Sequence, residues 1–569
     1  MHLRRLARAL TATAALTAAA VTSLGWGESP EPTTPQLGMN ITSVVYWSGD
    51  WPFVDLMKSA SDWRIQGDGG DWTRADQSEL IQDGTLVFTE DGYVKPAEGT
   101  WDAGDFGVQS IRTILPGGNE AADPDQRKRF YELPTGDYTL TASGTGKLRI
   151  TGGGFQDTTL ELSGVPRTVR VPRSAGTVGD GIEQFGLLSI LATSAEDPVR
   201  DIRFIMPGFE DTADSQPFHP LFLERLRPFK GLRMMDWGHT NQTHVSTWDQ
   251  RPTPNLFSYS MISRFVPEGE AGGVPLEVQV QLANAVEADL WICLPAKADA
   301  DYALKAVELC LAQLDPELNL VVEYANEVFN RAFLANKLAY AEGQKRFPDE
   351  KRWTQQGRVL AERFAELYQP IDAAYSGEQR ERIDLVVPYQ FLWFYKRQEG
   401  APHPDAVIAN SYWGIEFTQN LAKQPDVSKL TDVQVLERME EEVMPELRRK
   451  LEKTVEQLHD AYPDDTPPLW IYEGGSHFHD IWWNKQVADA TGAVTSRLRH
   501  HPRVGELVGE MIDLCGEMGM PWVYLFASTG GGFGHLEHPS QDPRDAPKYQ
   551  AAIRRILDAA DSAAIDEPG

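Results

Sequence analysis

Cysteine is scarce in this chain: only Cys293, Cys310 and Cys515 occur in 569 residues. Three cysteines are too few for the disulfide framework of a small secreted domain, and their spacing is not that of a metal-binding cluster. Each of them lies in an apolar stretch of sequence. The sequence therefore predicts buried free thiols.

Basic residues are also few. Lysine and arginine number 53 against 83 aspartates and glutamates, which gives a formal net charge of -30. Removing the three arginines of the N-terminal segment described next brings the charge to about -33. A field of this sign repels phosphate backbones and anionic lipid. We expect no nucleic-acid partner and no membrane association, and we interpret the acidity as favouring solubility.

Long apolar runs are missing beyond the N-terminus. There, three arginines precede an apolar run from Ala9 to Val21 and small residues follow it, which is the pattern of a cleaved export signal. The alternative is an uncleaved membrane anchor, but the run is shorter than the roughly 20 apolar residues that span a bilayer. The sequence predicts a signal peptide at residues 1–23, a proline-rich linker at 24–36, and a secreted or periplasmic protein.

Several catalytic and nucleotide-binding motifs are absent. No G-x-G-x-x-G or G-x-x-x-x-G-K-[ST] motif follows the first predicted strand, which disfavours an open doubly wound sheet that binds a nucleotide. No G-x-S-x-G elbow and no H-E-x-x-H helix occurs, so ester or peptide hydrolysis is disfavoured too. We expect neither a cofactor nor a metal ion.

Alternating Thr- and Val-rich segments separated by glycine turns fill residues 65–205, for example GDYTLTASGTGKLRITGGG. This pattern is typical of antiparallel strands with one apolar face. Such a face must be covered by a second layer. We therefore predict a β-sandwich domain over this range.

Outside that range, short apolar strands alternate with helical patterns, which indicates repeated βα units around a parallel sheet. The strand candidates are ITSVVYW and seven later runs that end at Trp237, Pro295, Glu327, Gln390, Trp413, Gly475 and Ser528. Eight such units close most naturally into a barrel. The predicted fold is α/β, a (β/α)8 TIM barrel made of residues 37–64 and 206–560. The antiparallel β-sandwich is inserted after its first strand, and a tail follows at 561–569.

Two glutamates stand at strand ends, where βα loops of barrel enzymes carry the catalytic groups. Glu327 closes the fourth strand candidate and Glu473 lies near the end of the seventh. Cleaving a glycosidic bond needs one carboxyl group to protonate the leaving oxygen and another to attack the anomeric carbon. Glu323 is an alternative to Glu327, since strand parity puts both on one face, but Glu323 lies deeper and needs a buried partner. The alternatives without a catalytic role are that Glu327 is a carboxylate at a helix N-terminus and that Glu473 is a turn residue.

The Asn326-Glu327 pair on strand four, together with a glutamate on strand seven, resembles clan A of retaining (β/α)8 glycosidases, which includes many cellulases and mannanases. The resemblance implies that Glu327 is the acid/base, Glu473 the nucleophile, and Asn326 a ligand of the sugar 2-hydroxyl. Tyr412 resembles the tyrosine that hydrogen-bonds the nucleophile in this clan. One departure is Phe526 at the end of strand eight, where the clan often has tryptophan.

Longer segments, among them MDWGHTNQTHVSTWDQR and VVEYANEVFN, are similar to secreted bacterial proteins described as cellulose-binding or hydrolase-like. This similarity runs over about residues 37–63 and 218–534 and leaves the predicted sandwich outside.

Further strand-end residues are candidates for sugar contacts. The polar candidates are Asp236, His239, Asn241, Asn410 and His477. Six tryptophans offer flat apolar faces for sugar rings, namely Trp47, Trp237, Trp248, Trp413, Trp482 and Trp483. Because most tryptophans are core residues, we expect only two or three of these six to contact sugar.

The sequence thus predicts a secreted retaining glycoside hydrolase that cleaves β-linked polysaccharide or oligosaccharide by double displacement. The carboxyl groups of Glu327 and Glu473 should lie about 5 to 5.5 Å apart. The charge of Glu473 should raise the pKa of Glu327. The alternative is a non-catalytic carbohydrate-binding protein on a glycosidase-like barrel. Two carboxylates alone specify neither the sugar nor its linkage.

Overall fold

The computed structural model describes residues 34–48, 50–117, 133–174, 185–260, 264–266, 269–424, 426–478 and 484–566. The predicted signal peptide and most of the predicted linker lie outside these ranges. Within them, no helix combines the length and the apolar character that crossing a membrane requires.

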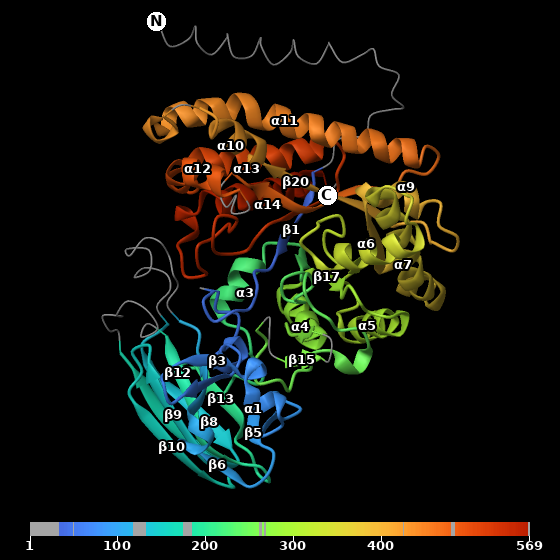
Figure 1. Ribbon diagram of the computed structural model, residues 1–569. Coiled ribbons are helices and arrows are strands. Elements are labelled where there is room, and N and C mark those ends of the chain that lie inside the picture. Colours follow the sequence, from blue (N-terminus) through green and yellow to red (C-terminus); the bar gives the residue numbers. More distant parts are fainter. Residues whose placement is uncertain are drawn as a thin grey trace, which may run out of the picture.

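Eight parallel strands close into a barrel, which confirms the predicted fold (Figure 1). In order around the barrel they are β1 (Gln36–Asn40), β14 (Gly231–Arg233), β17 (Asp289–Leu294), β18 (Leu320–Tyr324), β19 (Ile383–Pro388), β20 (Ala406–Trp413), β21 (Leu469–Ser476) and β22 (Trp522–Leu525). The last strand pairs with the first, since Gly38 is opposite Tyr524 and also opposite Gly231 of the second strand.

Helices surround the barrel (Figure 1). They are α3 (Pro220–Leu226), α4 (Leu276–Val286), α5 (Ala300–Gln313), α6 (Leu334–Arg346), α7 (Arg352–Ala374), α8 (Glu378–Glu381), α9 (Leu392–Tyr395), α10 (Ile415–Leu421), α11 (Asp432–Ala461), α12 (Lys485–Leu498), α13 (Pro502–Glu517) and α14 (Pro547–Asp566). The apolar strand faces and the helices share one large core.

The first barrel strand is not the predicted run ITSVVYW. The strand is Gln36–Asn40, and residues 41–45 after it are not in a strand, although Ile41 and Val44 still pack in the barrel core. Its sequence QLGMN has low β-propensity, but Gly38 is required because a Cβ there would lie 2.3 Å from Cδ1 of Tyr524. A tertiary contact thus overrides the local preference that favoured the β-branched run.

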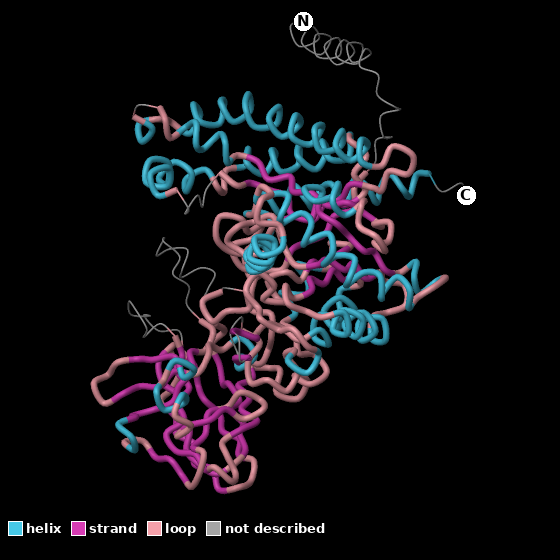
Figure 2. Tube along the Cα trace, turned by 45° about the vertical axis from the view of Figure 1, so that its right-hand side comes forward, coloured by secondary structure: helices cyan, strands magenta, loops and turns pink. Residues whose placement is uncertain are grey.

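An antiparallel β-sandwich follows this strand, as predicted (Figure 2). One sheet contains β2 (Arg64–Gly67), β3 (Trp72–Arg74), β6 (Thr100–Asp102), β7 (Val108–Ile114), β9 (Thr145–Gly152), β10 (Thr158–Ser163) and β12 (Gly186–Ser194). The other contains β8 (Gly136–Ser143), β11 (Arg167–Arg173) and β13 (Arg200–Ile205). Short two-stranded pairs are β4 (Leu86–Phe88) with β5 (Val94–Pro96) and β15 (Arg264–Val266) with β16 (Gly269–Ala271), and α1 (Glu79–Gln82) precedes β4. Buried residues of both main sheets form a single core.

The sandwich is attached to the barrel at the face that carries active sites in this fold. It leaves the barrel after β1, so it emerges at the C-terminal ends of the strands. A second connection comes from the loop between β14 and α4, whose Phe257 is buried in the sandwich core. The ring of Phe257 lies 5.2 Å from that of Trp63 and 5.7 Å from that of Tyr93.

The inside of the barrel has its own apolar cluster, separate from the core between strands and helices. Its buried members are Trp291, Val321, Val386, Ala406, Ile408, Trp470, Tyr472 and Tyr524. These side chains fill the interior, so the barrel has a packed floor and no open channel. Polar groups are found where the strands end.

Candidate active site

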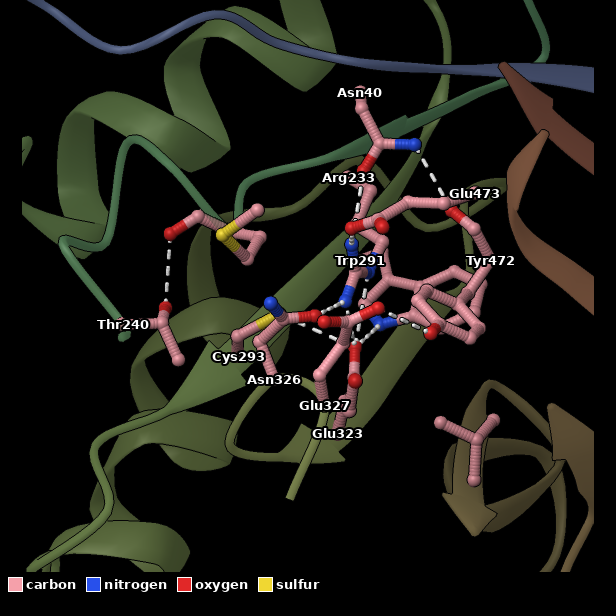
Figure 3. A network of polar contacts seen from close by, with 12 residues as sticks. Asn40, Arg233, Thr240, Trp291, Cys293, Glu323, Asn326, Glu327, Tyr472 and Glu473 are labelled. Carbon is pink, nitrogen blue, oxygen red and sulfur yellow. Dashed lines mark hydrogen bonds and ion pairs between the residues drawn. The ribbon is translucent and has the colours of Figure 1, made fainter. Parts of the chain in front are cut away.

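Arg233, the last residue of β14, is at the centre of the polar network in the barrel mouth (Figure 3). Its Nε donates to Glu323 at 2.9 Å, and Nη2 lies 2.8 Å from the same carboxylate oxygen. Nη1 donates to Asn40 at 2.9 Å and to Glu473 at 2.7 Å. Nη2 also donates to Asn326 at 2.7 Å. All five N–H groups of the guanidinium therefore have an acceptor.

This arrangement joins four separate strands or strand ends through one side chain. Arg233 is 0% exposed, so its charge is buried together with two carboxylates. A planar guanidinium holds its donors in fixed directions, which a lysine cannot do. Asn40 extends the network by donating to the backbone carbonyls of Tyr472 at 2.9 Å and Leu525 at 3.1 Å.

Glu473 is directed into the network by a β-bulge in β21. Ala409 of β20 pairs with Ile471 and Asn410 pairs with Glu473, so that Tyr472 is an extra residue in the ladder. A bulge interrupts the alternation of side chains. Tyr472 joins the interior cluster and the adjacent Glu473 binds Arg233, although strict alternation would place them on opposite faces.

The Glu473 carboxyl group is 4% exposed and both of its oxygens are bound. Oε1 accepts from Arg233 at 2.7 Å and Oε2 from the Tyr412 hydroxyl at 3.0 Å. Burial raises the pKa of Glu473 to about 8, with Glu327 adding to the rise, while Arg233 and Tyr412 oppose it. The sequence predicted that the charge of Glu473 raises the pKa of Glu327, whereas in the structure burial, with the charge of Glu327 as a lesser cause, raises the pKa of Glu473. The geometry gives Tyr412 the contact that the clan resemblance implied.

Glu327 lies just past β18 in a strained turn. Its φ is +40° and that of Ala325 is +52°, a left-handed conformation that costs a non-glycine residue roughly 1–2 kcal/mol. Asn330 stabilises the turn, since its backbone N–H and its side chain donate to the Glu327 carbonyl at 2.6 Å and to Oε2 at 2.8 Å. Tyr472 donates to Oε1 at 3.0 Å. Glu327 is partly exposed, whereas Glu473 is buried. Strain of this kind is concentrated at functional sites.

Glu323, the alternative to Glu327, lies deeper in the barrel and is 2% exposed. Besides Arg233, its Oε2 accepts from the indole N–H of Trp291 at 3.0 Å and from the Cys293 thiol at 3.3 Å. Burial raises the pKa of Glu323, and Arg233 opposes the rise. The buried partner that strand parity required is therefore present, whereas Glu327 is the partly exposed glutamate of the two.

Four of the other predicted polar residues, including Asn241, belong to the mouth of the barrel. Asn326 is 3% exposed and donates to the side-chain oxygen of Asn241 at 3.1 Å while it accepts from Arg233. Burial raises the pKa of Asp236 to about 6, with Arg233 opposing the rise. His239, 5% exposed with φ of +51°, occupies the same turn after β14.

His477 follows β21 and packs between two rings. Its imidazole lies 5.1 Å from the Tyr412 ring and 4.6 Å from the Phe533 ring. Burial lowers the pKa of His477 to about 4, so the imidazole beside Tyr412 is neutral near pH 7. Phe526, at the position where the clan often has tryptophan, lies 6.1 Å from Tyr412. Among the residues that the structure describes, no three His, Cys, Asp or Glu side chains are grouped as metal ligands.

The expectation that Trp237 and Trp413 bind sugar is not met. Trp237 is 1% exposed and stacks on Phe222 at 6.0 Å, while Trp413 is 2% exposed and stacks on Phe478 at 5.9 Å. Both rings are covered by core side chains, because burying so large an apolar surface is favourable.

The other candidate tryptophans differ from these two. Trp248 packs edge-on against Tyr302 at 5.5 Å. Trp47 is 46% exposed in the loop after β1. Trp482 and Trp483 lie outside the described residues.

Sequence reasoning missed Arg233, Asn40 and Tyr472. Arg233 had a detectable signal, since a charged residue inside the apolar run LRMMDW needs a buried acidic partner. Asn40 closes a strand that was not predicted. Tyr472 was not singled out: its ring lies in the interior cluster, while its hydroxyl binds Glu327.

No protein-family model matches this sequence, and no curated protein matches it. Several solved structures of glycoside hydrolases are similar in fold. A family 51 α-L-arabinofuranosidase (AbfB) from Bifidobacterium longum is 10% identical, with 61% of this chain and 68% of that chain covered and a TM-score of 0.39. The GH51 arabinofuranosidase from Xanthomonas axonopodis pv. citri is 11% identical, with 61% and 67% covered and a TM-score of 0.39.

A Bacteroidetes-affiliated GH5 cellulase is 13% identical, with 59% of this chain and 83% of that chain covered and a TM-score of 0.27. At such identities and TM-scores these structures transfer neither a family nor an activity to this chain.

Proposed function

We propose that this protein is an exported retaining glycoside hydrolase that cleaves β-linked polysaccharide or oligosaccharide. The observation that carries the proposal is the pairing of two glutamates in unlike environments at the C-terminal mouth of the barrel. Glu473 is buried and held by Arg233 and Tyr412, as suits a nucleophile that must not move. Glu327 is partly exposed, as suits a group that exchanges protons with substrate and water.

In the first step, a Glu473 carboxylate oxygen attacks the anomeric carbon while Glu327 gives its proton to the departing glycosidic oxygen. The products are a covalent glycosyl-enzyme and the free leaving-group alcohol. Arg233 and Tyr412 fix the orientation of the attacking carboxylate. Asn326, itself held by Arg233 and Asn241, is positioned to contact the sugar 2-hydroxyl.

In the second step, Glu327 removes a proton from water, which attacks the anomeric carbon and releases Glu473. Bond formation has by then neutralised Glu473, so the repulsion between the two carboxylates is absent and Glu327 can carry the charge as a base. Two inversions at the anomeric carbon give overall retention.

The test begins with a panel of polysaccharides and aryl glycosides, scored by release of reducing sugar or phenol. On an active substrate, NMR of the first product should show the anomeric configuration of the substrate. Inversion would contradict the mechanism. Binding of a glycan without any turnover would favour the alternative of a carbohydrate-binding protein.

Two variants assign the roles. Glu473→Gln should lose nearly all turnover, and near-normal turnover by this variant would refute its role. Glu327→Ala should retain the first step on aryl glycosides with good leaving groups, and added azide should speed the second step and yield a glycosyl azide, since azide needs no base. Glu317→Gln, on an exposed surface position, is the matched control.

Export is a separate part of the proposal. Expression of the full chain in a bacterial host that exports proteins should give a mature form whose N-terminus lies near residue 24. A protein that keeps its N-terminal segment and stays with the cells would contradict this part alone.

A further inference from the structure

Glu327 is connected to a lysine through two intervening side chains. The hydroxyl of Tyr472 donates to Oε1 of Glu327 at 3.0 Å (Figure 3). Nδ2 of Asn410 donates to that hydroxyl at 3.4 Å, and Nζ of Lys450 donates to Oδ1 of Asn410 at 2.6 Å. The four residues come from the β18 loop, β21, β20 and α11, which are far apart in the sequence.

We call these four hydrogen-bonded residues the relay. Their donor and acceptor groups determine which atom donates at each step. Lysine can only donate, so the amide oxygen of Asn410 must face Lys450 and the amide nitrogen must face Tyr472. The Tyr472 oxygen then accepts from Asn410, and its single hydrogen is left for Glu327. The orientation of an asparagine amide is usually ambiguous, but here the donor-only lysine determines it.

A second tyrosine makes the assignment more specific. Tyr412 donates to Glu473 and Tyr472 donates to Glu327, so each carboxylate has its own phenol. The Tyr472 hydroxyl accepts from Asn410, which in turn accepts from the Lys450 ammonium. Glu327 therefore has a supporting chain that ends outside the barrel, on helix α11.

The charges around Lys450 come from several elements. Surrounding protein atoms lower the pKa of its ammonium, while Glu446 on the same helix and Glu327 oppose this effect. Burial and the neighbouring Glu416 of α10 raise the pKa of Glu446, and Arg449 opposes the rise. The Lys450 side chain still has surface open to solvent, and its ammonium donates to Asn410.

Burial lowers the pKa of His477, and the charge of Lys450 lowers it further. A neutral imidazole adds no charge to the relay near pH 7. Charged groups near the relay are Glu327, Glu473 and Arg233 at one end. At the other end Lys450 is accompanied by Glu446, Glu416 and Arg449.

We propose that Lys450 is a positioning residue for Glu327, acting through Asn410 and Tyr472 to orient the hydrogen bond on its carboxylate and to set the pH at which it exchanges its proton. The inference rests on the proposed function for its catalytic consequence. The hydrogen-bond relay itself does not depend on that function.

The direction of the effect follows from which form accepts the bond. A hydrogen bond donated to a carboxylate stabilises the ionised form. Without Lys450, Asn410 and Tyr472 are free to reorient, so ionised Glu327 loses part of this support and its titration midpoint moves to higher pH. One net hydrogen bond corresponds to about half a pH unit to one unit.

The principal variant is Lys450→Met, which keeps the length of the side chain but removes the cation and its donors. Glutamates labelled with 13C at the side-chain carboxyl allow the Glu327 signal to be identified by its loss in Glu327→Gln and titrated by NMR. We expect an upward shift of about half a unit to one unit in Lys450→Met. Lys450→Arg, which is also a donor-only cation, should restore the original midpoint.

Two controls separate the relay from a simple charge effect. Lys453→Met removes the same charge from an exposed position of α11 and should leave the midpoint unchanged. In a Tyr472→Phe background the relay is already cut, so adding Lys450→Met should cause no further shift. An equal shift in that background, or none in the single variant, would overturn the proposal.

Enzyme activity is measured separately from the NMR titration. On a substrate that the enzyme cleaves, the basic limb of kcat/KM should move upward in Lys450→Met, because Glu327 keeps its proton to higher pH. If no substrate is cleaved, the proposed function fails, but the NMR titration still decides whether the relay exists. Thermal unfolding of each variant checks that the fold is retained.

Discussion

At the scale of single residues, Arg233 is the centre of the site. Its five donors are all used, and the acceptors belong to two carboxylates and two asparagines. A buried charge is tolerated only when it is paired and hydrogen-bonded in this way. Arginine is therefore required at position 233 by the number and direction of the acceptors and by the negative charge of the two carboxylates.

Arg233→Lys keeps the charge but loses the fork of donors. At least two of the acceptors should be left unpaired, which is expected to lower the free energy of unfolding by about 2–4 kcal/mol and kcat/KM at least about 100-fold. Denaturant unfolding and steady-state kinetics measure the two effects. Arg438→Lys, in a partly exposed helix pair with Glu442, should change neither. A fully active and stable Arg233→Lys enzyme would show that the network is dispensable.

Tyr412→Phe tests the electrostatics of the nucleophile. Tyr412 stabilises ionised Glu473, so its removal should raise the pKa of Glu473 above the present value of about 8. The reaction needs ionised Glu473, and its rate rises with pH through that midpoint. The acidic limb of kcat/KM should therefore move to higher pH by about one unit. Movement to lower pH would contradict the assignment, and Tyr340→Phe, away from the site, provides the control.

At the scale of elements, long periodic patterns were predictable and local interruptions were not. Strand β20 was predicted over its actual bounds, Ala406–Trp413, because eight residues between clear breaks leave little ambiguity. The first strand was misplaced because the packing of Gly38 against Tyr524 is a long-range contact that no local pattern reveals. The β21 bulge likewise depends on pairing with β20, so the placement of Tyr472 beside Glu327 could not be read from alternation.

The same reasoning explains the tryptophans. A position at a strand end does not show whether a neighbouring segment covers the ring. Trp237 and Trp413 are covered by Phe222 and Phe478, respectively, although both come at or just after the ends of barrel strands. Glu327 and Glu473 were easier to identify, since a carboxylate at a strand end needs either a partner or a function.

The connection between sandwich and barrel also depends on a few contacts. Phe257 belongs to a barrel loop but is 2% exposed inside the sandwich core. Phe257→Ala should cost about 3 kcal/mol and loosen this attachment. Hydrogen exchange should then speed up in the sandwich strands and in the loop before α4, while β20 and α11 remain protected. Val165→Ala, at an exposed position of the sandwich, is the control, and uniform exchange changes across the chain would argue against a local role.

At the scale of the whole molecule, the two ends of the barrel differ in the charged residues that they hold. The C-terminal mouth holds the glutamates around Arg233. The opposite end has Asp289 and Asp384 at the starts of β17 and β19, with Asp405 just before β20. Of these three, Asp405 is paired with Arg380 at 2.9 Å. In a chain with a net charge of -30, such a cluster should weaken the fold as it ionises.

The pKa of Asp384 sets the pH range over which this loss of stability is expected. Burial raises its pKa to about 7, with Asp405 and Asp289 adding to the rise, whereas an unfolded aspartate titrates near 3.9. A pKa raised in the folded state contributes stability that is complete below the unfolded value and is lost as pH rises through about 7. Asp384→Asn should therefore raise the Tm most at pH 8 and by a smaller amount at pH 5, where only part of the range between the two pKa values has been crossed. Its kcat/KM should be unaffected because the site lies at the other end of the barrel. Differential scanning calorimetry of this variant beside Asp349→Asn, an exposed control, measures the difference. An equal gain at both pH values, or a loss at pH 8, would mean that the ionisation of Asp384 does not limit stability.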